Sequence, residues 1–177
     1  MKLSLKVFCL SLLTVALIAG SAQAVALLPG SAKVRNVNGC VIEAHTNCGD
    51  MDLSHANLGG KNLSHANLEG ANLTGANLGG ANLGGANLSR ANLYGASLPS
   101  ANLHDANLSY ADLSVVLLGD ADLRGANLSY SDLFSTTFDG ANLTGANLTG
   151  VDVTQTFLQN ATGCSTVAPS GILNGLC

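Results

Sequence analysis

Leucine recurs at every fifth residue over most of this 177-residue chain. From residue 51 to residue 160 the sequence divides into 22 consecutive pentads with the consensus Ala-Asn-Leu-x-x and no insertion or deletion. Leucine holds the third position in 20 pentads, alanine the first position in 15, and Asn or Asp the second position in 18. A repeat this strict indicates a repetitive architecture, in which each unit buries its apolar side chains by stacking on its neighbours.

The spacing within a pentad favours short extended segments joined by turns. A period of five would spread leucine around the surface of a single α-helix, and the frequent Asn and Gly residues also oppose helix. In an extended segment the first and third side chains point to one side and the second points to the other. Glycine fills the fifth position in ten of the 22 pentads. This predicts a type II turn that starts at the leucine and has a positive φ at the fifth position.

These pentads resemble the pentapeptide-repeat family, whose motif is Ala-Asp/Asn-Leu-x-x. The resemblance covers residues 51–160 and implies an all-β fold, a right-handed quadrilateral β-helix with Leu and Ala inside. It also implies four pentads per coil, and therefore about five and a half coils for 22 pentads. One regularity supports four pentads per coil, because residues 20 apart would then share one side of the square. The four pentads without Asn or Asp at the second position all fall on one such side, at Ser97, Leu117, Thr137 and Phe157.

The N-terminus has the features of an export signal. Lys2 and Lys6 precede an apolar run over residues 7–19, and Ala22-Gln23-Ala24 has the small-x-small form of a signal peptidase site. Residues 1–24 are therefore predicted to be a signal peptide, with a mature chain that starts at Val25. Since no later apolar stretch approaches 18 residues, no membrane association is expected after cleavage. The expected location is the periplasm or the extracellular space, or the thylakoid lumen in a photosynthetic source.

Four cysteines remain after the signal peptide, and an even number in an exported chain indicates disulfides. They allow three connectivities. The rod implied by the resemblance would be roughly 26 Å long, whereas a disulfide tolerates Cα separations only up to about 7 Å. Residues 25–50 and 161–177 are predicted to cap the two ends of the rod, and each contains two cysteines. We therefore expect two local disulfides, Cys40–Cys48 and Cys164–Cys177.

Composition and motifs argue against catalysis and against nucleic-acid binding. Seven basic residues against 11 acidic ones provide no basic surface for nucleic acid. No Ser-His-Asp arrangement or phosphate-binding glycine loop occurs, and a rod filled with leucine leaves no pocket, so neither an enzyme nor a cofactor is expected. His55 and His65 would lie on opposite sides of the square, and no metal site is predicted. The alternatives left open are a cation- or ice-binding surface and, least favoured, a DNA mimic that inhibits topoisomerases. Against the last, residues 51–160 carry nine acidic and three basic residues, whereas duplex DNA of this length carries roughly 15 negative charges.

The C-terminal half of the repeat breaks the polar pattern at outward positions. Aromatic, apolar and charged side chains replace Asn, Gly and Ser there, and such patches indicate partner surfaces. The sequence thus predicts a non-enzymatic exported scaffold that binds a protein or glycan partner, as a monomer or a dimer. Two structural roles compete with this hypothesis, namely stacking of Tyr110 and Tyr130 on each other and on Arg90, and coverage of Leu117 and Phe157 by residues 161–177. The Asn columns elsewhere are expected to face water and to tolerate a change such as Asn107→Asp. The candidate face consists of Arg90, Tyr94, Tyr110, Asp112, Val115, Leu117, Tyr130, Asp132, Phe134 and Phe157.

Overall fold

The computed structural model describes residues 36–163 and 165–166. The predicted signal peptide, residues 1–24, lies outside the described residues, and so do Cys164 and Cys177. Within the described residues no helix is both long and apolar enough to cross a membrane.

A two-stranded antiparallel hairpin precedes the repeat. Strand β1 (Asn36–Val37) pairs with strand β2 (Cys40–Val41), with Asn36 opposite Val41. The two residues of the connection, Asn38 and Gly39, have φ angles of 49° and 94°. Positive φ at both central positions is the requirement of a type I′ turn, which Asn-Gly satisfies best. The Asn36 side chain also accepts a hydrogen bond from the Gly39 amide at 2.7 Å.

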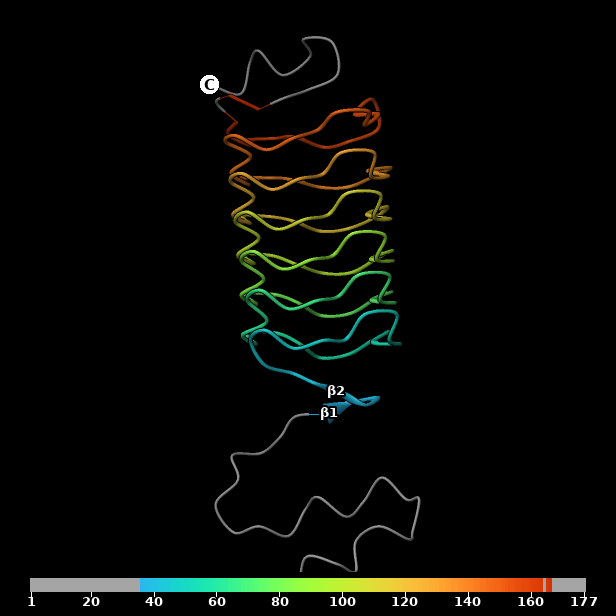
Figure 1. Cartoon of the computed structure of the whole chain (residues 1–177). Helices are drawn as coiled ribbons and strands as arrows, with labels where there is room; N and C mark the ends of the chain where they lie inside the picture. Colours follow the sequence, from blue (N-terminus) through green and yellow to red (C-terminus); the bar gives the residue numbers. More distant parts are fainter. Residues whose placement is uncertain (1–35, 164, 167–177) are drawn as a thin grey trace, which may run out of the picture. The chain divides into compact units, whose positions relative to one another are not determined.

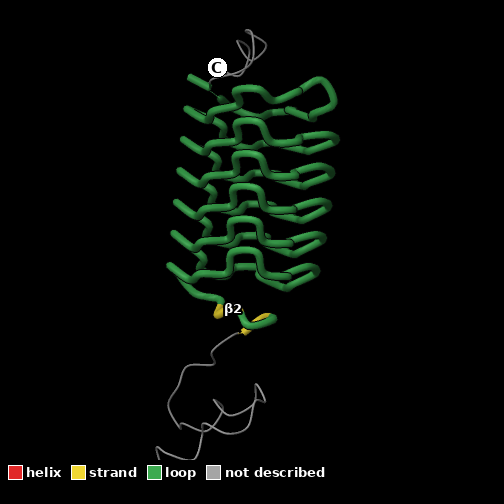
Figure 2. Tube along the Cα trace, turned by 45° about the vertical axis from the view of Figure 1, so that its right-hand side comes forward, coloured by secondary structure: helices red, strands yellow, loops and turns green. Residues whose placement is uncertain are grey.

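The repeat forms a stack of four-sided coils, and the predicted four-pentad coil is confirmed (Figure 1; Figure 2). Parallel bridges join second-position residues that are 20 apart, beginning with Asn47–Asn67 and ending with Asn142–Thr162. The ladder thus extends by one pentad beyond each end of the predicted repeat, through Asn47 at the start and Thr162 at the end. Each rung is a single residue wide, which explains why the sides appear as loops rather than as strands in Figure 2.

Each side is named here by its second-position residues in the C-terminal half. Side A contains Asp112 and Asp132, side B contains Leu117 and Phe157, side C contains Asp122 and Asn142, and side D contains Asn107 and Asn127.

Backbone hydrogen bonds hold successive coils together in a fixed pattern. The amide of the third-position residue donates to a carbonyl 19 residues later, as from Leu83 to Asn102 at 2.7 Å. The fifth-position amide makes the same contact, and the second-position amide donates back to the preceding coil. The first-position amide closes the turn, as from Ala86 to the Leu83 carbonyl at 2.9 Å. Four of the five amides in a regular pentad are therefore paired by the backbone alone.

The predicted inward positions form the core. Leucines of the third position and alanines of the first are almost fully buried along the stack. Phe138 replaces leucine with 1% exposure. Thr136 replaces alanine, and its hydroxyl donates to the Leu113 carbonyl at 2.7 Å, so that no polar atom is left unpaired there. Burial of each leucine side chain contributes about 1.5–3 kcal/mol, and the packed column is continuous from coil to coil.

Residues at the fifth position adopt the left-handed backbone conformation that the predicted turn requires. All fifth-position residues from His45 to Ser165 have positive φ, with Gln155 as the one exception among them. The exception coincides with a second irregularity. Side A has bridges from Asp52 to Asp132, but the described residues contain no bridge between Asp132 and Asp152. The ladder is thus weaker on this side at its C-terminal end.

The hairpin is fastened to the first coil by two contacts. Cys40 and Cys48 form a disulfide with their Cα atoms 5.3 Å apart, and both residues are buried in the core. Closure of so short a loop stabilises the fold by roughly 2–3 kcal/mol. Asn38 Nδ2 donates to the Asp52 carbonyl at 2.7 Å, a carbonyl that faces the end of the stack. The hairpin thereby covers part of an edge that would otherwise expose unpaired backbone groups.

Candidate functional site

The second-position side chains do more than face water. Asn107 Oδ1 accepts the amide of Ser109 at 3.2 Å, and Asn107 Nδ2 donates to Asn87 Oδ1 in the preceding coil, also at 3.2 Å. The first contact pairs the fourth-position amide, the only one that the backbone leaves free. The second links coils through a ladder of side-chain amides. Asn107 faces outward as expected, but the sequence did not predict its contact with Asn87, which forms because stacking at 20-residue spacing brings equivalent amides within hydrogen-bonding distance.

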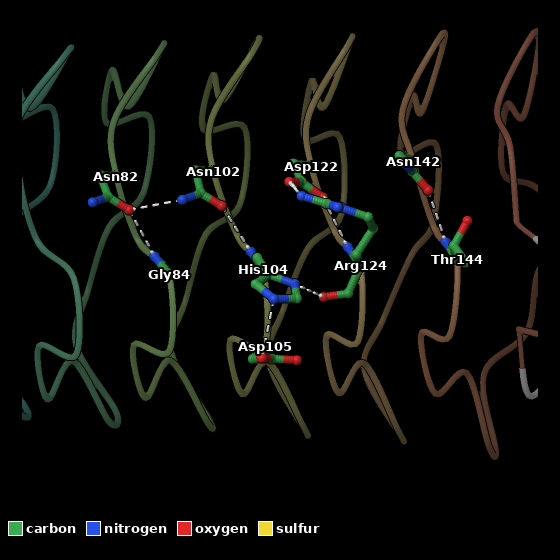
Figure 3. A network of polar contacts seen from close by, with 9 residues as sticks. All are labelled: Asn82, Gly84, Asn102, His104, Asp105, Asp122, Arg124, Asn142 and Thr144. Carbon is green, nitrogen blue, oxygen red and sulfur yellow. Dashed lines mark hydrogen bonds and ion pairs between the residues drawn. The ribbon is translucent and has the colours of Figure 1, made fainter.

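Side C shows how charged residues fit into the same ladder (Figure 3). Arg124 makes a two-point contact with Asp122, from Nε to Oδ1 at 2.8 Å and from Nη2 to Oδ2 at 2.6 Å. Hydrogen bonds from Arg124 hold the pKa of Asp122 below its usual value. His104 lies between the Arg124 carbonyl, 2.7 Å from Nδ1, and the Asp105 carboxylate, 3.2 Å from Nε2. This network joins neighbouring coils, and its groups lie on the open surface instead of converging on a pocket.

Two tyrosines of the candidate face form a stacked pair. The rings of Tyr110 and Tyr130 lie at the corner between sides D and A, with centroids 5.2 Å apart and planes 11° from parallel. The other face of Tyr130 lies over Gly150, where a Cβ atom would come within 2.5 Å of the ring. Arg90 Nη1 pairs instead with Glu69 Oε1 at 3.5 Å. The rings therefore present their edges and hydroxyl groups to the solvent, and both tyrosines are more than half exposed.

The opposite corner of side A carries three apolar residues. Tyr94, Val115 and Phe134 are all exposed, although each follows a buried leucine closely in the sequence. Val115 has a φ of 62°, a left-handed conformation that is a genuine outlier for a β-branched residue. Since its side chain is 41% exposed, burial provides little compensation for this conformation.

The carboxylates of Asp112 and Asp132 occupy adjacent rungs between these corners. Each Oδ1 accepts a fourth-position amide at 2.9 Å, from Ser114 and Phe134 respectively. Neither carboxylate has an N–H group to donate to the preceding coil, as an asparagine side chain does. The ladder of side-chain amides is therefore interrupted on this side. Among residues 36–163 and 165–166, no group of three or more His, Cys, Asp or Glu side chains is placed to hold a metal ion.

Leu117 and Phe157 belong to a different side from the acidic residues. Both point outward on side B, where bridges connect them through Thr137. The structure thus divides the candidate face into two groups. One is side A with its two corners, which holds Arg90, Tyr94, Tyr110, Asp112, Val115, Tyr130, Asp132 and Phe134. The other is the outward row of side B, which holds Leu117 and Phe157.

Two features of the described chain escaped the sequence reasoning. Asn38-Gly39 is a strong hairpin signal that was not used, although it stands between short runs that pair in the structure. Residues 161–163 were assigned to the cap, but Thr162 pairs with Asn142 as the last rung of the ladder; the signal was Ala161 at the first position of a further pentad.

Comparisons with known proteins identify the family of the repeat. The model of the family described as "Pentapeptide repeats" matches residues 46–85, 86–125 and 117–155. A search of curated proteins found no match. Among solved structures, a pentapeptide repeat protein of the Arabidopsis thaliana thylakoid lumen is 36% identical, over 59% of this chain and 70% of that one, with a TM-score of 0.46. HetL, from the cyanobacterium Nostoc sp. strain PCC 7120 and involved in regulating heterocyst differentiation, is 32% identical over 70% of each chain, with a TM-score of 0.43. QnrB1, a plasmid-mediated fluoroquinolone resistance protein, is 19% identical over 71% of this chain and 76% of that one, with a TM-score of 0.39.

Proposed function

The chain belongs to the pentapeptide-repeat family, which folds as a right-handed quadrilateral β-helix, and from this premise we propose that it is an exported, non-enzymatic scaffold. Proteins of this family are in general structural or interaction proteins and not enzymes. We assign protein binding to side A and its two corners, centred on Tyr110, Tyr130, Asp112 and Asp132.

The observation that carries this proposal is the presence of bulky residues where the backbone favours glycine. Tyr110, Val115 and Tyr130 all have φ near 60°. A left-handed conformation costs a residue with a side chain about 1–2 kcal/mol, and glycine avoids this cost. Because all three side chains are exposed, the fold regains little by burying them. Non-glycine residues adopt this conformation at all four corners, but the fifth-position tyrosines and valine occur only at the two corners of side A, which supports a functional role for that surface.

The charge of side A favours a cationic partner segment. The pentads of side A contain Asp112, Asp132 and two further aspartates, and Arg90, the one cation at a corner of this side, is paired with Glu69. Complementary charge accelerates encounter and excludes partners of the same sign. Exposed aromatic residues at both corners would supply the apolar contacts that dominate binding energy at interfaces.

Export and the second disulfide belong to the same proposal. The basic start, apolar run and Ala22-Gln23-Ala24 support cleavage after residue 24. The disulfide between Cys40 and Cys48 supports an oxidising compartment, in which Cys164 and Cys177 would pair with each other. N-terminal sequencing of exported protein should find Val25, and the presence of Met1 would contradict export. Non-reducing peptide mapping should find Cys164 joined to Cys177, and a Cys40–Cys164 peptide would contradict local pairing.

The binding surface is tested by a double variant, Tyr110→Ser with Tyr130→Ser. Wild type and variant are cross-linked in the native compartment, and the products are identified by mass spectrometry. We expect the variant to fold, with a melting temperature within a few degrees of wild type, and to lose the cross-linked partner. The matched control changes two fifth-position residues at other corners, Asp105→Ser with Asp120→Ser, and should keep the partner. If the tyrosine variant keeps the partner and melts much lower, the tyrosines are structural and the proposal is wrong.

A further inference from the structure

Side B departs from a rule that the other three sides obey. Elsewhere every fourth-position amide from Gly49 to Thr154 donates to the side chain of the second-position Asn or Asp of its own pentad, at 2.9–3.5 Å. On side B the second position is Ser97, Leu117, Thr137 or Phe157 in four successive coils. Pro99 has no amide hydrogen. The amides of Gly119, Asp139 and Gln159 have no hydrogen-bond acceptor within the part of the chain that the structure describes.

These three amides are stacked one above another. Residues 119, 139 and 159 are 20 apart, so they follow the bridges that join Leu117 to Thr137 and Thr137 to Phe157. Successive rungs of a β-ladder are about 4.8 Å apart. Side B therefore presents a short row of backbone donors that point away from the core, with one donor per coil.

An apolar wall and a shallow hollow accompany this row. Leu117 and Phe157 are 52% and 56% exposed, in positions that hold Asn or Asp on the other sides. A depression of about 270 Å³ is lined by Thr137, Asp139, Phe157 and Gln159. Side B thus combines an aromatic ring, backbone donors, a carboxylate, an amide and a hydroxyl group in one place.

The charges at this hollow select against ions of either sign. The exposed Asp139 carboxylate disfavours an anion next to the free amides, and its Oδ1 is already occupied by Asn160 Nδ2 at 3.1 Å. The backbone N–H groups offer a cation no acceptor, so a cation would contact only the exposed Asp139 carboxylate and leave the amides unused. A neutral molecule rich in hydroxyl groups can accept from the amides and donate to Asp139 and Gln159. Sugar rings have this chemistry, together with an apolar face that fits an aromatic side chain.

We propose that side B is a saccharide-binding site, in which one sugar ring packs on Phe157 and its hydroxyl groups pair with the amides of Asp139 and Gln159. Leu117 and the Gly119 amide extend the site by one rung towards the N-terminal end, so that a chain of sugars along the stack is favoured over a single ring. This site is separate from side A and does not depend on the protein partner proposed there.

The test follows the amides themselves by two-dimensional ¹⁵N–¹H NMR of the mature chain. Neutral oligosaccharides, namely cellotriose, chitotriose and maltotriose, are titrated to millimolar concentrations. At least one is expected to shift the signals of Gly119, Asp139 and Gln159. The fourth-position amides of Thr144 and Thr149 on sides C and D are paired to Asn side chains, and their signals should stay in place. Inorganic phosphate and guanidinium are titrated in parallel and should leave the three side B signals unchanged.

Two substitutions that restore the repeat consensus separate binding from folding. Thr137→Asn supplies a side-chain acceptor for the amide of Asp139, and Phe157→Asn supplies one for the amide of Gln159. Both variants should therefore fold at least as well as wild type. Each should abolish the sugar-induced shifts. Phe157→Leu keeps an apolar side chain and the free amide, and should weaken binding without abolishing it.

Several outcomes would overturn the proposal. One is the absence of shifts with all three sugars. Another is equal shifts in wild type and in Thr137→Asn, and a third is a response of the side B amides to phosphate or guanidinium instead. Nuclear Overhauser contacts between the Phe157 ring and residues 167–177 in the sugar-free protein would show that the chain itself occupies the hollow, and would equally contradict the proposal.

Discussion

The imidazole ring of His65 lies over Gly85 in the next coil, so that a Cβ atom on Gly85 would come within 2.5 Å of Nδ1. The other face of the same ring stacks on His45, with centroids 5.0 Å apart. The ring of a fifth-position His or Tyr thus leans towards the following coil, and it is followed 20 residues later by glycine or by a second ring that stacks on it. Tyr130 and Gly150 repeat the arrangement.

This relationship predicts that two equivalent glycines respond differently to the same change. Gly85 and Gly80 have φ of 65° and 62°, but a Cβ atom on Gly80 meets nothing within 4 Å. Both Gly→Ala variants lose about 1–2 kcal/mol through the left-handed backbone. Gly85→Ala should lose more, because it must also displace the ring of His65. Thermal unfolding followed by circular dichroism measures the difference, and equal melting temperatures would mean that the ring moves aside freely.

Replacement of Val115 by glycine should stabilise the protein. Its φ of 62° disfavours a β-branched residue, and the exposed side chain contributes little packing. We expect a gain of about 1 kcal/mol in the free energy of unfolding. The reciprocal change, Gly95→Val, affects the same position one coil earlier, where no atom lies within 4 Å, and it should destabilise by a similar amount. If Val115→Gly is less stable than wild type, the valine packs in a way that contradicts its exposure.

The side-chain ladder predicts a cost for Asn107→Asp that the sequence did not suggest. The variant keeps the acceptor for Ser109 but loses the donor to Asn87 Oδ1. Loss of one such hydrogen bond costs about 1 kcal/mol. Asn62→Asp is the matched control, because Asn62 lies in the first rung of its side and only accepts, from Ser64 and Asn82. Urea unfolding should show a lower midpoint for Asn107→Asp and an unchanged one for Asn62→Asp; two unchanged midpoints would mean that the ladder adds no stability.

Acid should weaken the contact between Asp122 and Arg124. The pKa of Asp122 is lowered in the folded state, so the contact stabilises above the unfolded pKa of about 3.9 and is lost as pH falls through the folded pKa. Both side chains are partly exposed, so the contribution at neutral pH is at most about 1 kcal/mol. Arg124→Ala should therefore melt slightly below wild type at pH 7, with the gap closing in acid. Arg90→Ala, whose contact with Glu69 is longer and more exposed, should change stability less at every pH.

The sequence was sufficient for the frame of the fold but not for the second-position contacts. The period of five and the inward Leu and Ala residues could be predicted, because alternation and turn chemistry are local properties. The 20-residue columns were implied by the family resemblance and supported by the four pentads without Asn or Asp. The link between Asn107 and Asn87 could not, because it depends on the distance between coils, which only the assembled stack sets. The same reason explains why the pairing of Arg90 with Glu69 was not foreseen, while stacking of the tyrosines on Arg90 was left open as an alternative. On side B, the sequence revealed the loss of Asn and Asp, but it took the hydrogen bonds of the assembled stack to show that three amides have no acceptor among the described residues.

The 20-residue column restricts how this chain can change in length. Insertion of one pentad between residues 120 and 121, for example, would keep the local hydrogen bonds but would move every later residue to the next side of the square. Tyr130 would then no longer lie over Tyr110, and the amides of Gly119 and Asp139 would no longer share a row. Insertion of 20 residues, by contrast, would lengthen the rod and leave each surface in register. Homologues that keep these surfaces should therefore differ in length by whole coils, and designed extensions should follow the same rule.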